Sequence, residues 1–405
     1  MRVWIENPFD NLPIEGFRPQ RFWLMADAFA ASKHDVTLWT SDFNHTTKRK
    51  RVKGEWSRAK GQGAGEKTLN PQLSTFNCIQ IPSIPYSKNV SVRRMFSHWR
   101  YAVTWEKMAR KFAAENGKPD VIIVSTPPLS TGAVARRLAK EYGARLIFDV
   151  MDAWPETFER VAPRWALAPL RRIAKGNYLA ADHITTVADR YIDLVRSYGY
   201  NGPATRFYHG ITIGDTAADS PLCRAACSAD TIHLAYIGNL GRTYDLETVV
   251  KALETLPTAT LEIAGQGEQE AMLRRRAAEN PRIKFLGYLG EDDMNALLKR
   301  CDIGIVPMAP ESCVGVPYKF ADYTRAGLAI VSSLGGESGD LLKRYGAGLS
   351  YRAGDAADLA TAISTIAASP EKYRRAALEL AKTEFSASAI YAAYVKTIEA
   401  LRGVN

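Results

Sequence analysis

The sequence predicts an α/β protein with two domains, each built on a parallel β-sheet covered by helices. Short β-rich runs alternate with amphipathic helical runs along the chain, a pattern typical of such sheets. The 405 residues, 46% of them apolar, suffice for two cores of ordinary size. A stretch rich in Gly, Ala and Ser, residues 209–230, separates two alternating series and predicts the boundary between the domains.

The first half opens with a strand, a helix and a strand. We expect the strands at residues 2–5 and 36–40 and the helix at 21–32, joined by a loop over residues 7–20. The loop after the first strand of such a unit lies at the carboxyl ends of the strands, where ligands bind in open α/β sheets. This loop is therefore a candidate part of a binding site.

A hydrophilic excursion over residues 41–70 follows and is too polar to hold a core. Beyond it, apolar runs predict four more strands and one intervening helix, which gives the half six strands. The strands are expected at 121–125, 145–149, 183–187 and 205–208, and the helix at 130–142.

The second series begins at Ile232 and is clearest between residues 283 and 332. Strands are expected at 283–286, 303–307 and 329–332, and helices at 291–301, 319–326 and 386–402. Gly327 ends the helix at 319–326, and a Pro-Tyr-Lys segment opens it. Free backbone N–H groups and the Lys319 cation then face the sheet edge, so an anion such as a nucleotide diphosphate fits there.

Five short motifs occur in the second half in a fixed order. They are YIGNLG with Gly238, IAGQGE with Gly265, FLG with Gly287, Cys301-Asp302, and PYKFADYTRAGLAIV. In this order and spacing they resemble the nucleotide-binding half of the retaining glycosyltransferases of family four, and the resemblance covers nearly the whole chain.

The resemblance implies the GT-B fold, in which two Rossmann-like domains face each other across a cleft. Residues 1–208 would bind the acceptor and residues 209–384 the nucleotide sugar, and a C-terminal helix within 385–405 would cross back to the first domain. The glycines of the motifs, Gly238, Gly265 and Gly287, would lie near the donor.

The donor phosphates need a cation that this chain supplies differently from the family it resembles. The family's diphosphate Arg and Lys align with Asn239 and Tyr244, which carry no positive charge. Arg242 and Lys319 are the remaining cations at these strand ends. We assign them to the donor phosphates and to catalysis, because they can stabilise the charge that develops on the leaving diphosphate.

The family's paired acidic residues are also altered. Asp322 occupies the position of the second and resembles a ligand of the ribose hydroxyls, whereas the first aligns with Val314. Glu311, Ser312 or the backbone N–H groups of residues 312–316 remain as alternatives for holding the donor sugar.

The loop over residues 15–21 holds Gly16 where related enzymes have glycines that let the backbone approach the donor diphosphate. Arg18 and Arg21 are cations beside it that can bind phosphate. We assign Arg21 to the donor and Arg18 to the acceptor; the alternative is that both are solvated arginines at a helix start.

The phrase DVMDAWPE follows directly on a predicted strand. Its Asp149 and Asp152 either cap the next helix, which begins near Pro155, or contact a ligand. In bacterial members that resemble this chain, an Asp-x-Trp-Pro phrase lies in the cleft near the acceptor. The resemblance makes Asp152 a candidate catalytic contact to the reacting sugar and Asp149 and Trp154 candidate acceptor contacts, together with His45 of the excursion.

Charge is unevenly distributed. Residues 1–200 hold 31 Lys plus Arg against 19 Asp plus Glu, whereas the rest of the chain is nearly neutral. A basic half predicts attraction to nucleic acid or to an anionic membrane surface. In a helix expected at 93–112, Arg93, Arg100, Lys107 and Lys111 fall within a stripe of about 40° beside aromatic residues. This is either an ordinary solvated face or an interfacial helix.

The composition bears on disulfides, metal sites and membrane-spanning segments. The five cysteines form no CxxC pair, which argues against a disulfide framework and a zinc site, and no Asp-x-Asp is present to hold a metal. No apolar run approaches the ~20 residues that span a bilayer. We expect no cofactor, no metal, and a cytoplasmic enzyme peripheral on the inner face of the plasma membrane.

The predicted function is a retaining transferase that moves a hexosyl or N-acetylhexosaminyl group from a UDP-sugar. The expected acceptor is a polyprenyl-diphosphate-linked sugar or another surface-glycan precursor, as in exopolysaccharide or lipopolysaccharide biosynthesis. The alternative is a non-hydrolysing sugar-nucleotide epimerase, which shares the GT-B architecture. A nucleic-acid-binding module is disfavoured, because no RRM, KH or helix-turn-helix pattern accompanies the basic charge.

Overall fold

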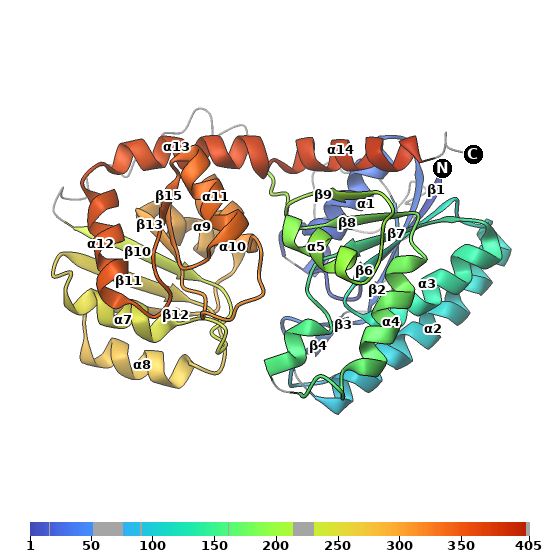
Figure 1. Cartoon of the computed structure of the whole chain (residues 1–405), viewed down its shortest axis with the longest axis horizontal. Helices are drawn as coiled ribbons and strands as arrows, with labels where there is room; N and C mark the ends of the chain where they lie inside the picture. The colour runs from blue at the N-terminus through green and yellow to red at the C-terminus, as the bar shows by residue number, and fades with distance from the viewer. Residues whose placement is uncertain (16, 52–75, 90, 161, 214–230, 402–405) are drawn as a thin grey trace, which may run out of the picture. The chain divides into compact units, whose positions relative to one another are not determined.

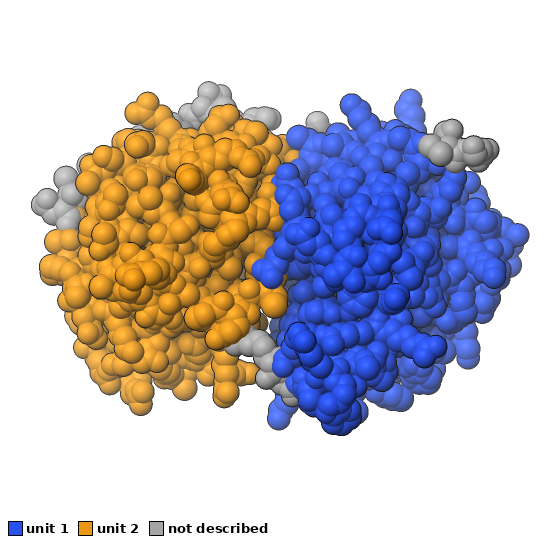
Figure 2. Space-filling model, viewed as in Figure 1, with its two compact units in different colours: residues 1–207, 388–405 blue, residues 208–387 orange. Residues whose placement is uncertain are grey.

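The computed structural model describes the chain except residues 16, 52–75, 90, 161, 214–230 and 402–405. The chain forms two compact units, residues 1–207 with 388–405 and residues 208–387 (Figure 2). Each unit holds one parallel sheet with helices packed on it (Figure 1). The predicted α/β class with two parallel-sheet domains is confirmed.

The sheet of the first unit has seven parallel strands in the order β5-β2-β1-β6-β7-β8-β9. Their bounds are β1 (Arg2–Glu6), β2 (Asp35–Ser41), β5 (Asn77–Ile81), β6 (Val121–Thr126), β7 (Arg145–Val150), β8 (His183–Thr186) and β9 (Ala204–Arg206). All six residues of β6 are buried because helices cover both faces of the sheet. The expected six strands omitted β5, which pairs with β2.

The helices of the first unit are α1 (Arg21–Ala31), α2 (Val92–Asn116), α3 (Leu129–Tyr142), α4 (Ala168–Leu179), α5 (Asp189–Ser197) and α14 (Ala387–Ala400). Two short 3-10 helices, Pro13–Glu15 and Glu156–Arg160, and the hairpin β3 (Phe43–Asn44) with β4 (Arg49–Lys50) complete it. Helices α2, α3 and α4 pack side by side, with α3 against β6 and β7 (Figure 1). The predicted excursion thus begins as a hairpin, and its residues 52–70 lie outside the described part.

Helix α14 returns to the first unit. The Tyr394 ring lies 4.9 Å from the ring of Phe207 and 6.3 Å from that of Phe29 in α1, centroid to centroid. Near its C-terminal end, Glu399 bonds to His34 at 2.8 Å. These contacts confirm the expectation that the terminal helix packs on the first domain.

The sheet of the second unit has six parallel strands in the order β12-β11-β10-β13-β14-β15. They are β10 (Ile232–Ile237), β11 (Ala259–Ala264), β12 (Ile283–Gly287), β13 (Ile303–Val306), β14 (Ala329–Ser332) and β15 (Gly348–Ser350). The helices are α7 (Leu246–Glu254), α8 (Glu270–Glu279), α9 (Glu291–Arg300), α10 (Tyr318–Arg325), α11 (Gly336–Tyr345), α12 (Ala356–Ala367) and α13 (Pro370–Glu384). In sequence order this is the 3-2-1-4-5-6 arrangement of dinucleotide-binding folds.

Both sheets therefore have a point at which the strand order reverses. It lies between β1 and β6 in the first unit and between β10 and β13 in the second. Ligands of open α/β sheets bind beyond the carboxyl ends of the strands at this point. A ligand-binding site in each unit is therefore expected at the loops that follow these strands.

Candidate functional site

In the second unit, glycines line the carboxyl edge of the sheet. Gly238 and Gly265 follow β10 and β11, and Gly287 ends β12. The Gly265 N–H donates to the Gly287 carbonyl at 2.7 Å. A Cβ on Gly265, whose φ is 151°, would lie 1.8 Å from the Gly238 carbonyl oxygen, so no other residue fits there. The result is an edge of bare backbone that a ligand can approach closely.

The loops after β10 and β13 are joined at the switch point. The Asp245 N–H donates to the Pro307 carbonyl at 2.7 Å, and the Ala309 N–H donates to the Thr243 carbonyl at 2.9 Å. The Asp245 side chain also caps α7 by accepting from the Thr248 N–H at 3.1 Å. These contacts fix the residue 241–245 loop beside the segment that leads into α10.

Lys319, in the first turn of α10, is enclosed at this point. Its Nζ lies 4.1 Å from the ring centroid of Tyr236 and 4.0 Å from that of Tyr244. Among the described residues, Nζ has no hydrogen-bond partner. A Cβ placed on Gly238 would lie 3.3 Å from Nζ, so the amine adjoins the glycine edge. Two aromatic faces thus position a cation whose hydrogen bonds are unused.

Burial lowers the pKa of Lys319 to about 7, although the Asp322 carboxylate opposes this shift. The amine therefore titrates near neutral pH. An anion brought to Nζ would favour the charged form and would also meet the N-terminal N–H groups of α10. The arrangement offers a cation and helix N–H groups to which an anion such as a diphosphate can bind.

The other predicted donor residues differ in how exposed their side chains are. Asp322 is buried on α10. Arg242 is 88% exposed and pairs with the exposed Glu268 at 2.9 Å, a surface pair of little energetic weight. Glu311 is exposed, and the Ser312 hydroxyl accepts from the Val314 N–H at 3.3 Å. Of the two predicted cations, Lys319 is held in place by its surroundings and Arg242 is not.

In the first unit, Arg21 and Asp149 form a buried ion pair, which favours a structural role over their predicted roles at the donor and the acceptor. Both side chains are 0% exposed and bind each other through two contacts, Nε–Oδ1 at 2.9 Å and Nη2–Oδ2 at 2.8 Å. Arg21 also donates to the Phe207 carbonyl, and Asp149 accepts from Thr185 at 2.7 Å and Tyr394 at 3.3 Å. With these bonds made inside the core, both side chains are already satisfied without a ligand, so their contacts to a donor phosphate and an acceptor stay predictions.

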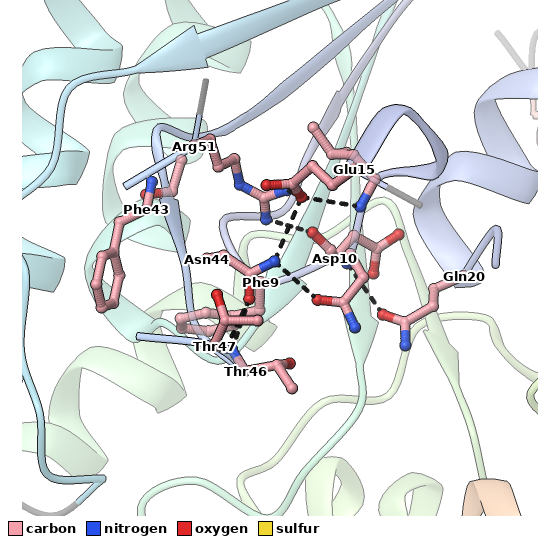
Figure 3. A network of polar contacts seen from close by, with 12 residues as sticks. Phe9, Asp10, Glu15, Gln20, Phe43, Asn44, Thr46, Thr47 and Arg51 are labelled. Carbon is pink, nitrogen blue, oxygen red and sulfur yellow. Dashed lines mark hydrogen bonds and ion pairs between the residues drawn. The ribbon is translucent and has the colours of Figure 1, made fainter. Parts of the chain in front are cut away.

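The loop after β1 is anchored by a polar network around Arg51 (Figure 3). The enclosed Arg51 guanidinium forms an ion pair with Glu15 and donates to the Asp10 carbonyl at 2.5 Å. Asn44 of β3 donates to Glu15 at 3.3 Å. The Asp10 carboxylate accepts from two N–H groups of the first turn of α1 and so caps that helix. Burial raises the pKa of Asp10 to about 6.

Two predicted residues belong to this loop. Gly16 lies outside the residues that the structure describes. Arg18 is half-buried between the 3-10 helix Pro13–Glu15 and α1. Their predicted roles at the donor and the acceptor stay proposals.

The remaining candidates of the first unit, His45, Asp152 and Trp154, gather at the carboxyl ends of β2 and β7. They do so with residues that sequence reasoning did not select, and we call the set the α2 cluster: Phe9, His45, Lys48, Tyr86, Arg94, His98, Asp152 and Trp154. His45 Nδ1 lies 2.6 Å from the Tyr86 hydroxyl. Arg94 Nε donates to His98 Nε2 at 3.3 Å.

Aromatic rings surround the Arg94 guanidinium. Its Cζ lies 5.3 Å from the ring centroid of Trp154, 5.7 Å from that of Phe9 and 5.8 Å from that of Tyr86. A small hollow beside them is lined by Phe9, Tyr86 and His98, among others. Asp152 is held next to this group by the Ala153 N–H at 2.8 Å and the Thr157 hydroxyl at 3.2 Å. Its contacts fit the capping alternative as well as a ligand contact.

The electrostatics of the α2 cluster favour an anion. Burial and the neighbouring Arg94 lower the pKa of both His45 and His98 to about 3, so both imidazoles are neutral at physiological pH. Burial, and then Arg94, lowers the pKa of Lys48 to about 8. Burial raises the pKa of Asp152 although Arg94 attracts its charge. The cluster therefore presents two cations, Arg94 and Lys48, with the Asp152 carboxylate near Arg94.

Some of the missed residues carried a signal in the sequence. Arg94 and His98 are four residues apart and so share a helix face, and Tyr236 lies two residues before Gly238 at the end of a predicted strand. Tyr244 lacks the charge of the lysine with which it aligns, but its ring helps to hold Lys319. Lys48 and Tyr86 lie in irregular segments without a pattern that singles them out.

Comparison with known proteins places this geometry in context. The family model described as a glycosyl transferase 4-like domain matches residues 20–207, and the model described as glycosyl transferases group 1 matches residues 231–369. The glycogen synthase of Mycobacterium tuberculosis strain ATCC 25618 / H37Rv is 28% identical over 183 residues. That match spans 44% of this chain and only 44% of the relative.

Several solved structures share the whole fold. Sucrose-phosphate synthase from Thermosynechococcus elongatus has a TM-score of 0.73 at 14% identity, covering 100% of both chains. Anabaena HepE, solved in complex with UDP and glucose, has a TM-score of 0.66 at 13% identity, covering 99% of this chain and 100% of its own. WaaG, described as a glycosyltransferase involved in lipopolysaccharide biosynthesis, has a TM-score of 0.61 at 13% identity. The match covers 98% of this chain and 99% of WaaG. The shared architecture is GT-B, as the sequence predicted.

Proposed function

The chain belongs to the family-four glycosyltransferases with the GT-B fold, and from this premise we propose that it moves a sugar from a nucleotide-diphosphate donor to a surface-glycan precursor. Both matched families are glycosyl transferases, so the alternative of an epimerase is not favoured. Whether a hexosyl or an N-acetylhexosaminyl group is moved depends on contacts to the sugar, for which Glu311, Ser312 and the backbone of residues 312–316 remain the candidates.

The observation that carries the proposal is Lys319 at the glycine edge of the second unit. Cleavage of the bond between the anomeric carbon and the diphosphate leaves negative charge on the phosphate. Lys319 Nζ has unused hydrogen bonds and the N-terminus of α10 beside it, so both stabilise that charge. Asp322, on the same helix, is suited to the ribose hydroxyls.

The proposed donor is a UDP-sugar, because the structural relative HepE is described in complexes with UDP and with UDP-glucose. We propose retention of configuration without a protein nucleophile, in which the leaving phosphate takes the proton of the acceptor hydroxyl. Asp152 would then contact the reacting sugar, and Trp154 and His45 the acceptor. WaaG, as a lipopolysaccharide enzyme, supports an acceptor of the surface-glycan class.

Thermal unfolding in the presence of nucleotides tests the donor proposal. A ligand at 100 times its Kd adds about 2.7 kcal/mol to stability, so a saturating UDP-sugar should raise the unfolding temperature by several degrees. UDP and GDP, with and without sugars, form the panel, and the nucleosides are the matched controls. If no nucleoside diphosphate raises the unfolding temperature above its nucleoside, the proposal fails.

We further propose that α2 brings the enzyme to anionic membranes. None of the helices that the structure describes is long and apolar enough to cross a bilayer. At the start of α2, however, Val92, Met95, Phe96 and Trp99 recur at helical spacing and all are exposed, Val92 at 86% and Trp99 at 54%. The predicted basic residues Arg93, Arg100, Lys107 and Lys111 are exposed on the adjoining face. Apolar and basic stripes side by side are typical of interfacial helices.

Exchange of Arg100 and Lys107 for glutamate is expected to release the protein from anionic vesicles, because each basic residue near the surface contributes about 1 kcal/mol. Sedimentation with vesicles containing phosphatidylserine measures binding. The double variant Arg275→Glu, Lys299→Glu changes the charge equally on exposed residues of the second unit and should leave binding unchanged. Equal loss in both variants, or equal binding of the parent to neutral vesicles, would contradict a role for this helix.

A further inference from the structure

The first turn of α2 carries charge of the wrong sign for an isolated helix. The positive end of a helix dipole favours acidic residues, yet the first turn has none and instead holds Arg93 and Arg94. Ser91 caps the helix by accepting from the Arg94 N–H at 3.2 Å, which satisfies one of the N–H groups that a helix N-terminus leaves without an intrahelical partner. An anion at this end would satisfy both the dipole and the arginines.

A second cation is held next to Arg94 through the same residue. Arg94 Nη1 donates to the Asn89 backbone carbonyl at 2.6 Å, and Lys48 Nζ donates to the Asn89 side-chain oxygen, also at 2.6 Å. Both cations also lie within 6 Å of the Tyr86 ring centroid, at 5.8 Å and 5.0 Å. Within the described part of the chain, neither forms an ion pair with a carboxylate. Two like charges are therefore kept together without a direct ion pair, and the Asp152 carboxylate acts on Arg94 only at longer range.

The position of Lys48 is fixed by the backbone. It sits in the turn between β3 and β4 with φ at 59°, a left-handed conformation that residues other than Gly and Asn adopt at a cost. Asn44 Oδ1 accepts from the N–H groups of Thr46 and Thr47, at 2.9 Å and 3.0 Å, and holds that turn (Figure 3). The turn therefore holds Lys48 in a costly backbone conformation, with its amine bonded to Asn89 beside Arg94.

His98 supplies a further unused donor. Its side chain is 5% exposed and lines the hollow beside Phe9 and Tyr86. Because Nε2 accepts from Arg94, the proton of the neutral ring lies on Nδ1, which has no partner among the described residues. A buried donor without a partner is costly unless a ligand satisfies it.

We propose that Arg94 and Lys48, at the N-terminal end of α2, form a binding site for a phosphate group of the acceptor. The inference rests on the proposed function, since it supposes an acceptor, and it adds the chemical group that the first unit recognises. Arg94 already donates through Nε to His98 and through Nη1 to the Asn89 carbonyl. These two nitrogens are therefore not both free for the planar two-point contact that suits a carboxylate. Separate donors that converge from α2 and the β3–β4 turn suit a tetrahedral phosphate instead.

The source of the phosphate that we favour is a lipid. The apolar stripe of Val92, Met95, Phe96 and Trp99 is on the outer side of the same helix turns, centred about 150° around the axis from Arg94 at 100° per residue. A helix with its side chains is about 10–12 Å across. If the stripe rests on a membrane, the Arg94 site lies about one helix diameter above it, within reach of a lipid-borne phosphate and the sugar attached to it.

The test measures binding of farnesyl phosphate in neutral detergent to the full chain, with farnesol and glucose 1-phosphate as separate arms. We expect Arg94→Gln and Lys48→Gln each to weaken farnesyl phosphate binding about tenfold or more, since each removes a charge-assisted hydrogen bond. Lys118→Gln removes an exposed cation just beyond the other end of α2; it is the matched control and should change binding less than twofold. UDP binding should be the same in all variants.

Each outcome decides a separate point. Equal binding of farnesol and farnesyl phosphate, or variants that bind farnesyl phosphate as the parent does, would overturn the phosphate site while the proposed function stands if UDP still binds. Tight glucose 1-phosphate binding with weak farnesyl phosphate binding would overturn the lipid source. If Arg94→Gln does not fold, Lys48→Gln decides alone, because Lys48 lies in a turn and not in the core. A parent that fails to bind UDP at all would contradict the proposed function itself.

Discussion

Replacing Lys319 with alanine is expected to lower turnover by about 10²- to 10³-fold, the usual loss when one donor to a developing anion is removed. The reason is that charge on the leaving diphosphate grows in the transition state, so an interaction with it affects turnover more than binding. Steady-state kinetics with a saturating donor and nucleoside binding by calorimetry measure the two quantities separately. Nucleoside affinity should fall much less than turnover.

The matched control is Arg242→Ala, which also removes a cation from the same strand ends. Because Arg242 is exposed and already paired with Glu268, its loss should reduce turnover far less than the loss of Lys319. Equal losses of turnover and nucleoside affinity in Lys319→Ala would mean that the substitution disturbs the donor site as a whole and not the interaction with the diphosphate alone. No loss at all would remove Lys319 from the donor site.

The pH dependence of diphosphate binding should follow from the same residue. With a pKa of about 7, Lys319 in the free enzyme is charged below pH 7 and neutral above it. Binding of a diphosphate favours the charged form, so above pH 7 it must take up a proton, and affinity should fall by up to tenfold per pH unit. This fall should be absent in Lys319→Ala and in nucleoside binding.

Replacing Arg21 with methionine is expected to lower the free energy of unfolding by about 3–5 kcal/mol, because it leaves the Asp149 carboxylate buried without its partner. Asp149 would keep only the hydroxyls of Thr185 and Tyr394. Urea unfolding followed by circular dichroism measures the effect. The double variant Arg21→Met, Asp149→Leu should recover much of the loss, since a well-packed apolar pair avoids the desolvation of both charges.

A small destabilisation, below about 1 kcal/mol, together with weaker donor binding would restore Arg21 to the phosphate site. With Arg21 in a structural role, we expect a large loss of stability and little loss of donor affinity. Donor affinity, measured below the unfolding transition, should be close to that of the parent.

The sequence predicted the fold well because its signals are local. Strands such as β6 are uninterrupted apolar runs, and Gly327, whose φ is 74°, closes α10 where the pattern stops. β5 was missed because it is short, only partly apolar and preceded by a hydrophilic excursion that hides its pairing with β2. A strand at the edge of a sheet carries a weaker hydrophobic pattern than a central one.

The site was harder to predict because its contacts join distant parts of the chain. Arg21 and Asp149 are 128 residues apart, so nothing near either one shows that they neutralise each other. The rings around Lys319 come from β10 and from the loop before α7. On α2, the helical pattern drew attention to the exposed basic face, whereas Arg94 and His98 face the other way and acquire meaning only beside Lys48 and Tyr86.

The most direct test of the account is whether the sugar leaves its nucleotide only when an acceptor is present. The parent enzyme would be incubated with a UDP-sugar labelled in the sugar, with and without a membrane lipid extract containing polyprenyl-diphosphate-linked sugars. The account predicts that label moves to the lipid phase in the complete mixture, that it does not in Lys319→Ala, and that the donor is unchanged without lipid. Conversion of the UDP-sugar to an epimer in the absence of lipid would contradict it.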